Sequence, residues 1–226
     1  MTCKTFHKVF SHAIVFSVIS ENDKDVSVEA LPRFSSFAID GSLLGFGMNN
    51  DIAKVLIDEE VILRRLDTVA EKILVDFKGE DILVVGILTG ALVFMADLCR
   101  RLPVPLEIET LGVASYHGGT ESSGVVEFLD TKLPEVKGRH ILLIDDILDT
   151  GRTLKAVKER LLAIGAVTVK TSVLLSKEKE RAEEVGADYI GFEIGDEFVV
   201  GYGLDYQGRY RNLPYVGVLK EEVYSR

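Results

Sequence analysis

The 226-residue sequence contains no tryptophan, only five prolines and only two cysteines. Cys3 and Cys99 cannot supply the bridge framework of a small secreted domain, so we expect a reduced, cytoplasmic protein. A composition that is 47% hydrophobic and 27% charged is typical of a globular protein with one sizeable core. No segment approaches the roughly 20 apolar residues that cross a bilayer, and we expect no membrane association.

Positive charge is also scarce. The chain has 26 Lys and Arg against 36 Asp and Glu, a formal net charge of −10. This balance disfavours a broad surface for nucleic-acid phosphates, and we expect no nucleic-acid partner. The P-loop string G-x-x-x-x-G-K-[ST] is absent. The "GFG" at 45–47 follows no strand pattern and lacks the third glycine of a dinucleotide fingerprint.

Residues 1–47 are expected to form an N-terminal extension of unknown role, and 48–226 the main domain. The first 20 residues place lysines ahead of a short apolar run, as a signal peptide does. Ser17 interrupts that run, and no A-x-A cleavage site follows it. A start codon assigned too early would produce the same pattern.

The main domain alternates strand and helix patterns. Apolar residues recur at helical spacing over 58–77, in "ALVFMADLCRRL" (91–102), and from Leu154 to a stop at Gly165. Strand patterns cover 81–88, 106–115, 140–145 and 167–176. This alternation predicts an α/β fold with a parallel-sheet core flanked by helices. The polar stretch 115–124 interrupts it and is either a mobile lid or the tip of an ordinary hairpin.

The stretch "ILLIDDILDTGRTL" (141–154) carries the clearest chemical signal, with Asp145, Asp146 and Asp149 close together. Ligands of parallel sheets bind beyond the carboxyl ends of the strands, and a helix N-terminus binds anions. Gly151 allows close backbone approach to a phosphate. Carboxylates accept hydrogen bonds from ribose hydroxyls and attract Mg²⁺. The combination indicates a sugar phosphate. A helix cap would explain one aspartate, not three.

The same stretch resembles the 5-phosphoribosyl-1-diphosphate (PRPP) signature of type I phosphoribosyltransferases, with the purine-type enzymes most similar over 51–224. The resemblance implies the type I fold with a small C-terminal hood, and transfer of a phosphoribosyl group to hypoxanthine or guanine with release of pyrophosphate. It also implies Mg²⁺ as cofactor and a homodimer or homotetramer. A xanthine-preferring relative and a regulator that senses PRPP or nucleotides remain alternatives.

Residue roles follow from the resemblance by position. Asp149 would be the general base, and the PRPP site would comprise Asp145, Asp146, Asp149, Thr150, Gly151, Arg152, Thr153, Leu88, Thr89, Gly90 and Arg211. The purine site would comprise Lys177, Phe198, Val199 and Asp205. The metal ligands would be Asp145, Asp146 and Asp205, and the lid would include Ser115 and Tyr116.

Loop 88–91, "LTGA", would bind pyrophosphate through backbone amides, and its Leu88–Thr89 peptide bond would be cis. Many relatives carry a lysine where this chain has Thr89, so this loop lacks a cation. By pattern alone, Lys177 and Arg211 could be surface charges, Phe198 could be core, and Arg209 is as good a candidate as Arg211.

Overall fold

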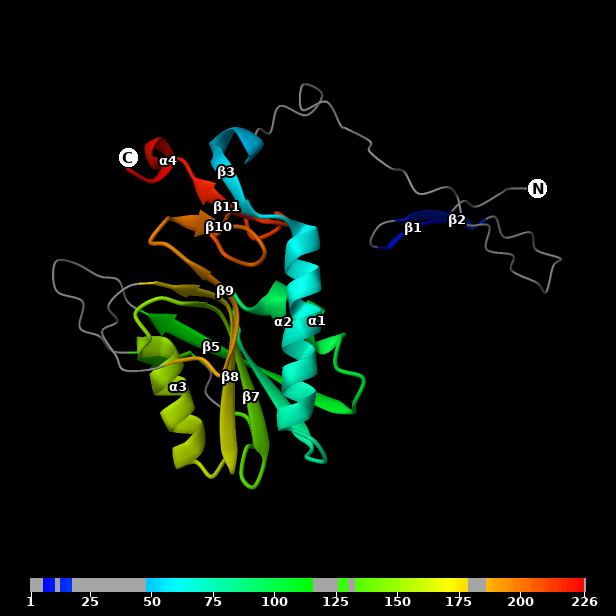
Figure 1. Cartoon of the computed structure of the whole chain (residues 1–226), viewed down its shortest axis with the longest axis vertical. Coiled ribbons are helices and arrows are strands. Elements are labelled where there is room, and N and C mark those ends of the chain that lie inside the picture. Colours follow the sequence, from blue (N-terminus) through cyan, green and yellow to red (C-terminus); the bar gives the residue numbers. More distant parts are fainter. Residues whose placement is uncertain are drawn as a thin grey trace. The chain divides into compact units, whose positions relative to one another are not determined.

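The computed structural model describes residues 6–10, 13–17, 48–115, 126–129, 133–178 and 186–225. The chain divides into two compact units, Met1–Gly47 and Met48–Arg226. In the first unit, strands β1 (Phe6–Phe10) and β2 (Ala13–Ser17) pair antiparallel. The second unit contains the remaining elements (Figure 1).

The second unit is built on a six-stranded sheet in the order β6-β5-β4-β7-β8-β9. Its strands are β4 (Ile82–Leu88), β5 (Leu106–Ser115), β6 (Val126–Phe128), β7 (His140–Leu148), β8 (Thr168–Lys177) and β9 (Tyr189–Ile194). All neighbours pair parallel except β5 and β6. The parallel-sheet core predicted from the sequence is confirmed.

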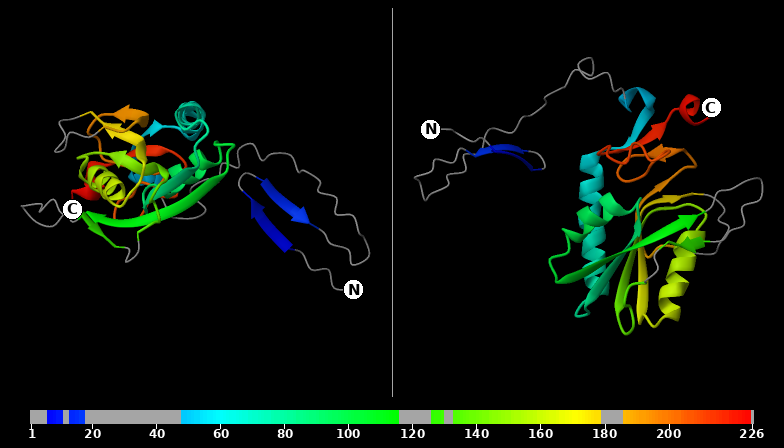
Figure 2. Two further views of the ribbon diagram at one scale, coloured as in Figure 1. Left: turned by 90° about the horizontal axis from the view of Figure 1, so that it is seen from below. Right: turned by 180° about the vertical axis from the view of Figure 1, so that it is seen from behind.

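Three helices cover the two faces of this sheet (Figure 2). Helices α1 (Glu59–Asp76) and α2 (Leu92–Cys99) pack on one face, where Ile62 and Phe94 belong to the same apolar cluster as Val84 of β4. Helix α3 (Arg152–Ala163) packs on the other, where Val157 belongs to the same apolar cluster as Val85. Because β4 is buried on both faces, its sequence is a continuous apolar run rather than an alternating one.

A second, three-stranded antiparallel sheet in the order β10-β11-β3 forms the hood. Its strands are β3 (Ile52–Ile57), β10 (Val199–Val200) and β11 (Val216–Leu219). The short elements η1 (Met48–Asp51) and α4 (Glu221–Tyr224) flank its two ends in the chain. The hood is therefore not purely C-terminal, since β3 comes from the start of the domain.

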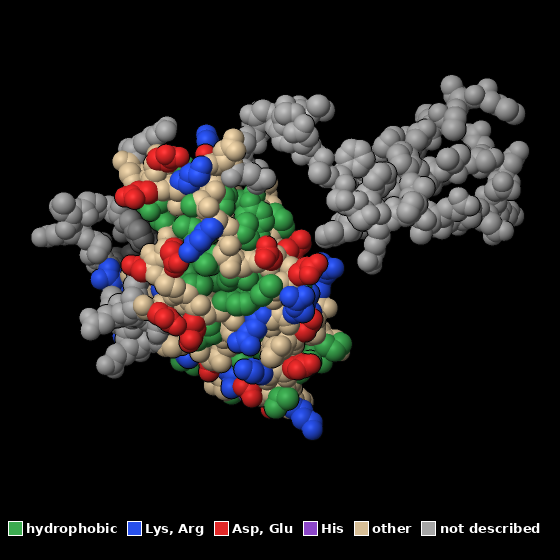
Figure 3. Space-filling view, turned by 45° about the horizontal axis from the view of Figure 1, so that its top comes forward, with side chains coloured by type: hydrophobic (Ala, Val, Ile, Leu, Met, Phe, Trp, Pro, Cys, Tyr) green, Lys and Arg blue, Asp and Glu red, His purple; other side chains and the backbone are tan. Residues whose placement is uncertain are grey.

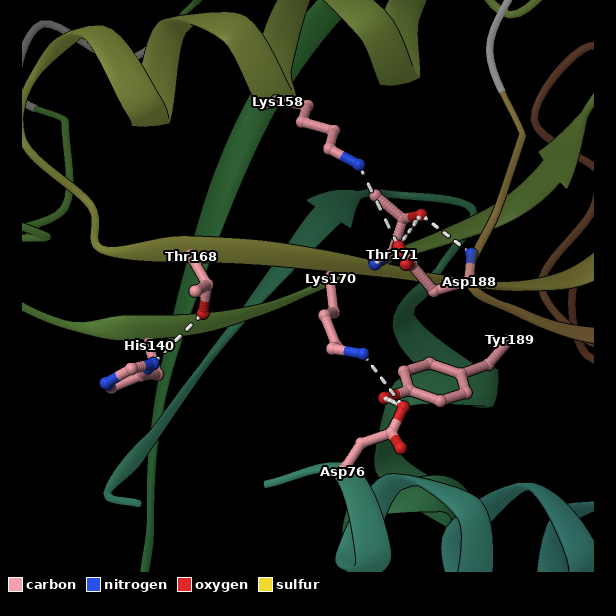
Figure 4. Close-up of polar contacts among 8 residues, drawn as sticks. All are labelled: Asp76, His140, Lys158, Thr168, Lys170, Thr171, Asp188 and Tyr189. Atoms are coloured by element: carbon pink, nitrogen blue, oxygen red, sulfur yellow. Dashed lines mark hydrogen bonds and ion pairs between the residues drawn. The ribbon is translucent and has the colours of Figure 1, made fainter. Parts of the chain in front are cut away.

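Polar clamps tie α1 and α3 to the amino ends of β8 and β9 (Figure 4). The Tyr189 hydroxyl and the Lys170 ammonium both donate to Asp76 Oδ2, at 2.7 and 2.9 Å. These two donors lower the pKa of the Asp76 carboxyl. On the other face, Asp188 accepts from the backbone and hydroxyl of Thr171. The clamps lie at the edge of the sheet opposite to the carboxyl ends, and we assign them a structural role.

The surface mixes charges of both signs. Figure 3 shows acidic and basic side chains interspersed around a hydrophobic area on the face that it presents. Within the described part of the chain, no helix is both long and apolar enough to span a bilayer.

The buried Cys99 packs in the core, where burial raises the pKa of its thiol to about 11. This environment keeps the thiol protonated and unreactive.

Candidate active site

The residues expected to bind PRPP and the purine lie at or near the carboxyl ends of neighbouring strands. Loop 88–91 follows β4, and β4 pairs parallel with β7, which carries Asp145 and Asp146. Lys177 ends β8, the next strand in the sheet. Parallel neighbours place their carboxyl ends at one edge, so three separate parts of the sequence meet there.

Asp145 and Asp146 lie inside β7, whose end was predicted wrongly at residue 145. The strand continues to Leu148 because Ile147 and Leu148 pair with Leu175 and Ser176 of β8. Asp145 Oδ1 accepts the N–H of Asp146 at 3.0 Å, and Asp146 Oδ1 accepts the N–H of Ile147 at 2.8 Å. Both carboxylates are thus held by the backbone of the strand that carries them.

The environment of these two carboxylates disfavours their charged forms. Burial raises the pKa of Asp145 well above its ordinary value, and the charge of Asp146 raises it further. Burial also raises the pKa of Asp146, while its hydrogen bonds and the Arg211 guanidinium act in the opposite direction. Hydroxyl donors or a cation beside the pair would relieve this cost.

The DTGRT turn (149–153) connects β7 to α3. Gly151 has φ +81°, in the left-handed region that glycine adopts most readily, and it directly precedes the helix. Gly151, at the N-cap position, has no side chain that could cap α3, and the Arg152 N–H lies 3.5 Å from Thr150 Oγ1. First-turn N–H groups at a helix start bind anions. Asp149, the first residue of this turn, is half-buried, while Thr150 is exposed. The turn therefore fits an anion cradle beside a carboxylate.

Loop 88–91 packs between β7 and the hood. Its Leu88–Thr89 bond is cis, as the resemblance implied. A Cβ on Gly90 would lie 1.7 Å from Asp146 Oδ2, a distance that no real side chain tolerates. A Cβ on Gly203 of the hood would lie 2.2 Å from the Gly90 carbonyl oxygen. Loop 88–91 therefore lies against the Asp146 carboxylate on one side and the backbone at Gly203 on the other, and only glycine fits at positions 90 and 203.

Arg211 and Asp205 come together in the segment between β10 and β11. Arg211 Nη2 lies 2.7 Å from Asp205 Oδ1, and Arg211 Nη1 donates to the Gly203 carbonyl at 2.7 Å. Asp205 Oδ2 also accepts the N–H of Gly208 at 2.7 Å. The guanidinium therefore spans from Asp205 to the glycine that contacts loop 88–91. Arg209, by contrast, is exposed, and its backbone pairs with that of Tyr206.

The residues expected to bind the purine lie at the end of β8 and in the hood. Lys177 is 13% exposed, with its ammonium 3.0 Å from Asp196 Oδ1. Phe198 is 37% exposed and stacks on Tyr224, with ring centroids 4.8 Å apart. Tyr206 meets the Phe198 ring edge-on at 5.7 Å. Val199 begins β10 and pairs with Val218.

The lid prediction is only partly covered by the structure. Ser115 ends β5 and pairs with Val126 of β6, whereas Tyr116 lies outside the described residues. Sequence reasoning missed Tyr202, Asp97 and Tyr224. The one available signal for Tyr202 was its position between two glycines in "GYG" (201–203), which marks an unusual backbone.

The donor set suits Mg²⁺ but does not form a cage for it. In the part of the chain that the structure describes, no group of three His, Cys, Asp or Glu side chains is placed to hold a metal ion. Mg²⁺ usually binds one or two carboxylates and completes its shell with water and substrate oxygens. Asp145 and Asp146 supply such a pair of carboxylates, and a cation beside them would offset the cost of burying their charges.

Comparison with known proteins points to one family. The family model described as "Phosphoribosyl transferase domain" matches residues 55–207. The hypoxanthine-guanine phosphoribosyltransferase of Lactococcus lactis is 47% identical over 184 residues, covering 81% of this chain and 100% of the relative. That of Streptococcus pneumoniae is 46% identical over 178 residues, covering 79% of this chain and 99% of the relative.

A solved structure shows the same fold. The crystal structure of a hypoxanthine phosphoribosyltransferase from Staphylococcus aureus superposes with a TM-score of 0.75 at 43% identity, covering 79% of this chain and 97% of that one. The region that matches the family model, residues 55–207, contains the paired aspartates, the DTGRT turn and loop 88–91. This chain therefore belongs to the phosphoribosyltransferase family and has its type I fold.

Proposed function

We propose that this protein transfers the 5-phosphoribosyl group of PRPP to hypoxanthine or guanine in purine salvage, giving the nucleoside monophosphate and pyrophosphate. Membership of the phosphoribosyltransferase family supports the reaction class. The observation that carries the proposal is the meeting of the Asp145–Asp146 pair, the DTGRT turn and loop 88–91 at one edge of the sheet. These three parts match the hydroxyls, the 5′-phosphate and the pyrophosphate of PRPP.

In this assignment, Asp145 and Asp146 accept hydrogen bonds from the ribose hydroxyls. The first-turn amides of α3, with Thr150, Arg152 and Thr153, bind the 5′-phosphate. Loop 88–91, with Leu88, Thr89 and Gly90, binds the pyrophosphate, and Arg211 contacts it from the hood. The burial of the aspartates supports this arrangement, because ligand hydroxyls relieve the cost of their charge.

The chemical step exchanges one bond at C1 of the ribose for another. The bond from C1 to the pyrophosphate oxygen breaks, and a purine ring nitrogen forms a new bond to C1. Asp149 takes the proton that the purine sheds, and pyrophosphate leaves with the electron pair of the broken bond. Water would intercept the oxocarbenium-like state, which gives a lid over 115–124 a physical purpose.

For the purine, we assign Lys177 to the 6-oxo group, Phe198 to stacking, and Val199 to a backbone hydrogen bond. Lys177 contacts Asp196 in the structure, so base binding would exchange or share this contact. Tyr224 stacks on one face of Phe198, so a base that stacks on Phe198 would use the opposite face or displace the Tyr224 ring.

Asp145, Asp146 and Asp205 are the residues that would hold Mg²⁺. When bound, the ion supplies charge neutralisation for the departing pyrophosphate. Asp205 is paired with Arg211 and would have to leave it to serve as a ligand.

We further propose that 48–226 is the catalytic domain, and that the protein is a homodimer or homotetramer. Light scattering on a sizing column measures the assembly directly.

The test is a steady-state assay with PRPP, Mg²⁺ and each of hypoxanthine, guanine and xanthine. Turnover of hypoxanthine or guanine with stoichiometric pyrophosphate is expected, and no turnover of any base would reject the proposal.

Asp149→Asn should lower kcat by roughly 10²–10⁴ while changing the KM for PRPP only modestly, because it removes the proton acceptor. Normal turnover with a collapsed PRPP affinity would instead make Asp149 part of the phosphate cradle.

A further inference from the structure

Tyr202 is a buried residue of the hood whose hydroxyl contacts helix α2, which packs on the central sheet. Only 2% of it is exposed, and its hydroxyl donates to Asp97 Oδ2 at 2.6 Å. Burial and the Asp97 carboxylate raise the pKa of Tyr202, so its hydroxyl stays protonated and remains a donor. Asp97 lies in α2, the helix that begins directly after loop 88–91.

The backbone around Tyr202 is unusual. Gly201, Tyr202 and Gly203 have φ values of +97°, +50° and +104°. A tyrosine adopts positive φ at a cost, and residues held this way commonly serve a site. Hydrogen bonds on both sides hold the segment, among them those from Tyr202 N–H to the Leu213 carbonyl at 2.8 Å and from Gly203 N–H to the Arg211 carbonyl at 3.0 Å. The turn therefore presents Gly203 in one fixed orientation.

That orientation places Gly203 against Gly90, which in turn lies against Asp146. The hydrogen bonds within loop 88–91 are long, at 3.3 Å from Ala91 N to Ile87 O and 3.2 Å from Leu92 N to Thr89 O. These distances are at or beyond the upper end of the usual range, so the loop depends on its neighbours for its position. Its neighbours on the two sides are the Asp146 carboxylate and the 201–203 turn.

We propose that the Tyr202–Asp97 hydrogen bond is a positioning device that holds the 201–203 turn against loop 88–91 and so fixes the loop for the pyrophosphate group of PRPP. Tyr202 touches no substrate and acts through Gly203 and Gly90. This inference rests on the proposed function of the site. It joins the hood, which we assign to the purine, with the loop that we assign to pyrophosphate.

The competing explanation is that this hydrogen bond only stabilises the fold. Tyr189 offers a matched control, because it is also buried, at 4% exposure, and its hydroxyl donates to Asp76 Oδ2 at 2.7 Å (Figure 4). Tyr189 begins β9, at the edge of the sheet away from loop 88–91. Tyr189→Phe and Tyr202→Phe thus delete the same group from similar surroundings, and only one deletion touches the proposed coupling.

Two measurements on the full-length protein separate the explanations. The first is amide hydrogen exchange of peptides covering 86–95, without any ligand. Tyr202→Phe should lose protection there, and Tyr189→Phe should not. The second is steady-state kinetics, where Tyr202→Phe should raise the KM for PRPP by roughly tenfold, as expected for a lost hydrogen bond to a charged group. Its KM for hypoxanthine and its kcat should stay within about twofold.

A double-mutant cycle supplies the third arm. Asp97→Ala should reproduce the rise in the KM for PRPP, and the double variant Tyr202→Phe with Asp97→Ala should add little to either single change. Additive effects would show that the two residues act separately and would overturn the proposal. So would unchanged exchange at 86–95, an unchanged KM for PRPP, or an equal rise in Tyr189→Phe. If the wild type formed no nucleotide from PRPP, the proposed function would fail, and exchange would still decide whether Tyr202 positions the loop.

Discussion

Replacing Gly90 by alanine tests whether loop 88–91 and Asp146 form one PRPP-binding unit. The new Cβ would lie 1.7 Å from Asp146 Oδ2 and 2.5 Å from its Cγ, so the carboxylate or the loop must move by more than 1 Å. Moving the carboxylate breaks its hydrogen bond from the Ile147 N–H, which is 2.8 Å long. A hydrogen bond to a charged group contributes about 1.5–3 kcal/mol, equivalent to roughly 10- to 150-fold in an equilibrium constant.

We therefore expect Gly90→Ala to raise the KM for PRPP by roughly 10- to 100-fold, since Asp146 would no longer meet the ribose in the same geometry. Initial rates against PRPP at saturating hypoxanthine measure this directly. Gly186→Ala is the control, because a Cβ there meets nothing within 4 Å and the residue has an ordinary φ. A KM for PRPP within about twofold of wild type in Gly90→Ala would refute the reasoning, provided that the protein is folded.

Three further outcomes follow from the site. Lys177→Met should lower kcat/KM for 6-oxopurines by roughly tenfold to a hundredfold, because it removes a charge-assisted hydrogen bond. An equal loss of affinity for PRPP would contradict the assignment. Thr89→Lys restores the cation that many relatives carry and should lower the KM for PRPP, whereas an unchanged KM would show that the cation is dispensable here. Removing residues 1–47 should keep hypoxanthine turnover within roughly threefold, because every assigned residue lies in 48–226, and loss of folding would show that the extension completes the core.

Local sequence patterns were sufficient to predict strands β4, β5, β7 and β8 and to recognise the PRPP signature, whereas β6 and β9 were not predicted. The predicted strand 106–115 coincides with β5, and helix α1 occupies 59–76 of the predicted 58–77. These elements are long, and their apolar periodicity is strong. Aspartate is a poor strand former, so the pattern ended β7 at residue 145, whereas pairing of Ile147 and Leu148 with β8 extends it. Tertiary pairing overrode local propensity at the point where the site begins.

The hood contacts depend on the folded structure and have no local sequence signal. The pairing of β3 with β11 joins the two ends of the domain, and neither segment reveals its partner. Likewise, the hydrogen bond between Tyr202 and Asp97 spans 105 positions. The predicted helix 91–102 ends at Cys99, since the following residues form a tighter turn in which Leu102 donates to the Cys99 carbonyl.

The hood is built from strands at both ends of the domain, and this determines when the domain can be completed during synthesis. A ribosome releases β3 early and β11 almost last, and Asp51 and Tyr210, which share a hydrogen bond, are 159 positions apart. The central sheet can therefore form on the growing chain while β3 still lacks its neighbour. Only a full-length polypeptide can close the hood, so a chain that stops before residue 216 would carry the PRPP signature without the strand that joins its two ends.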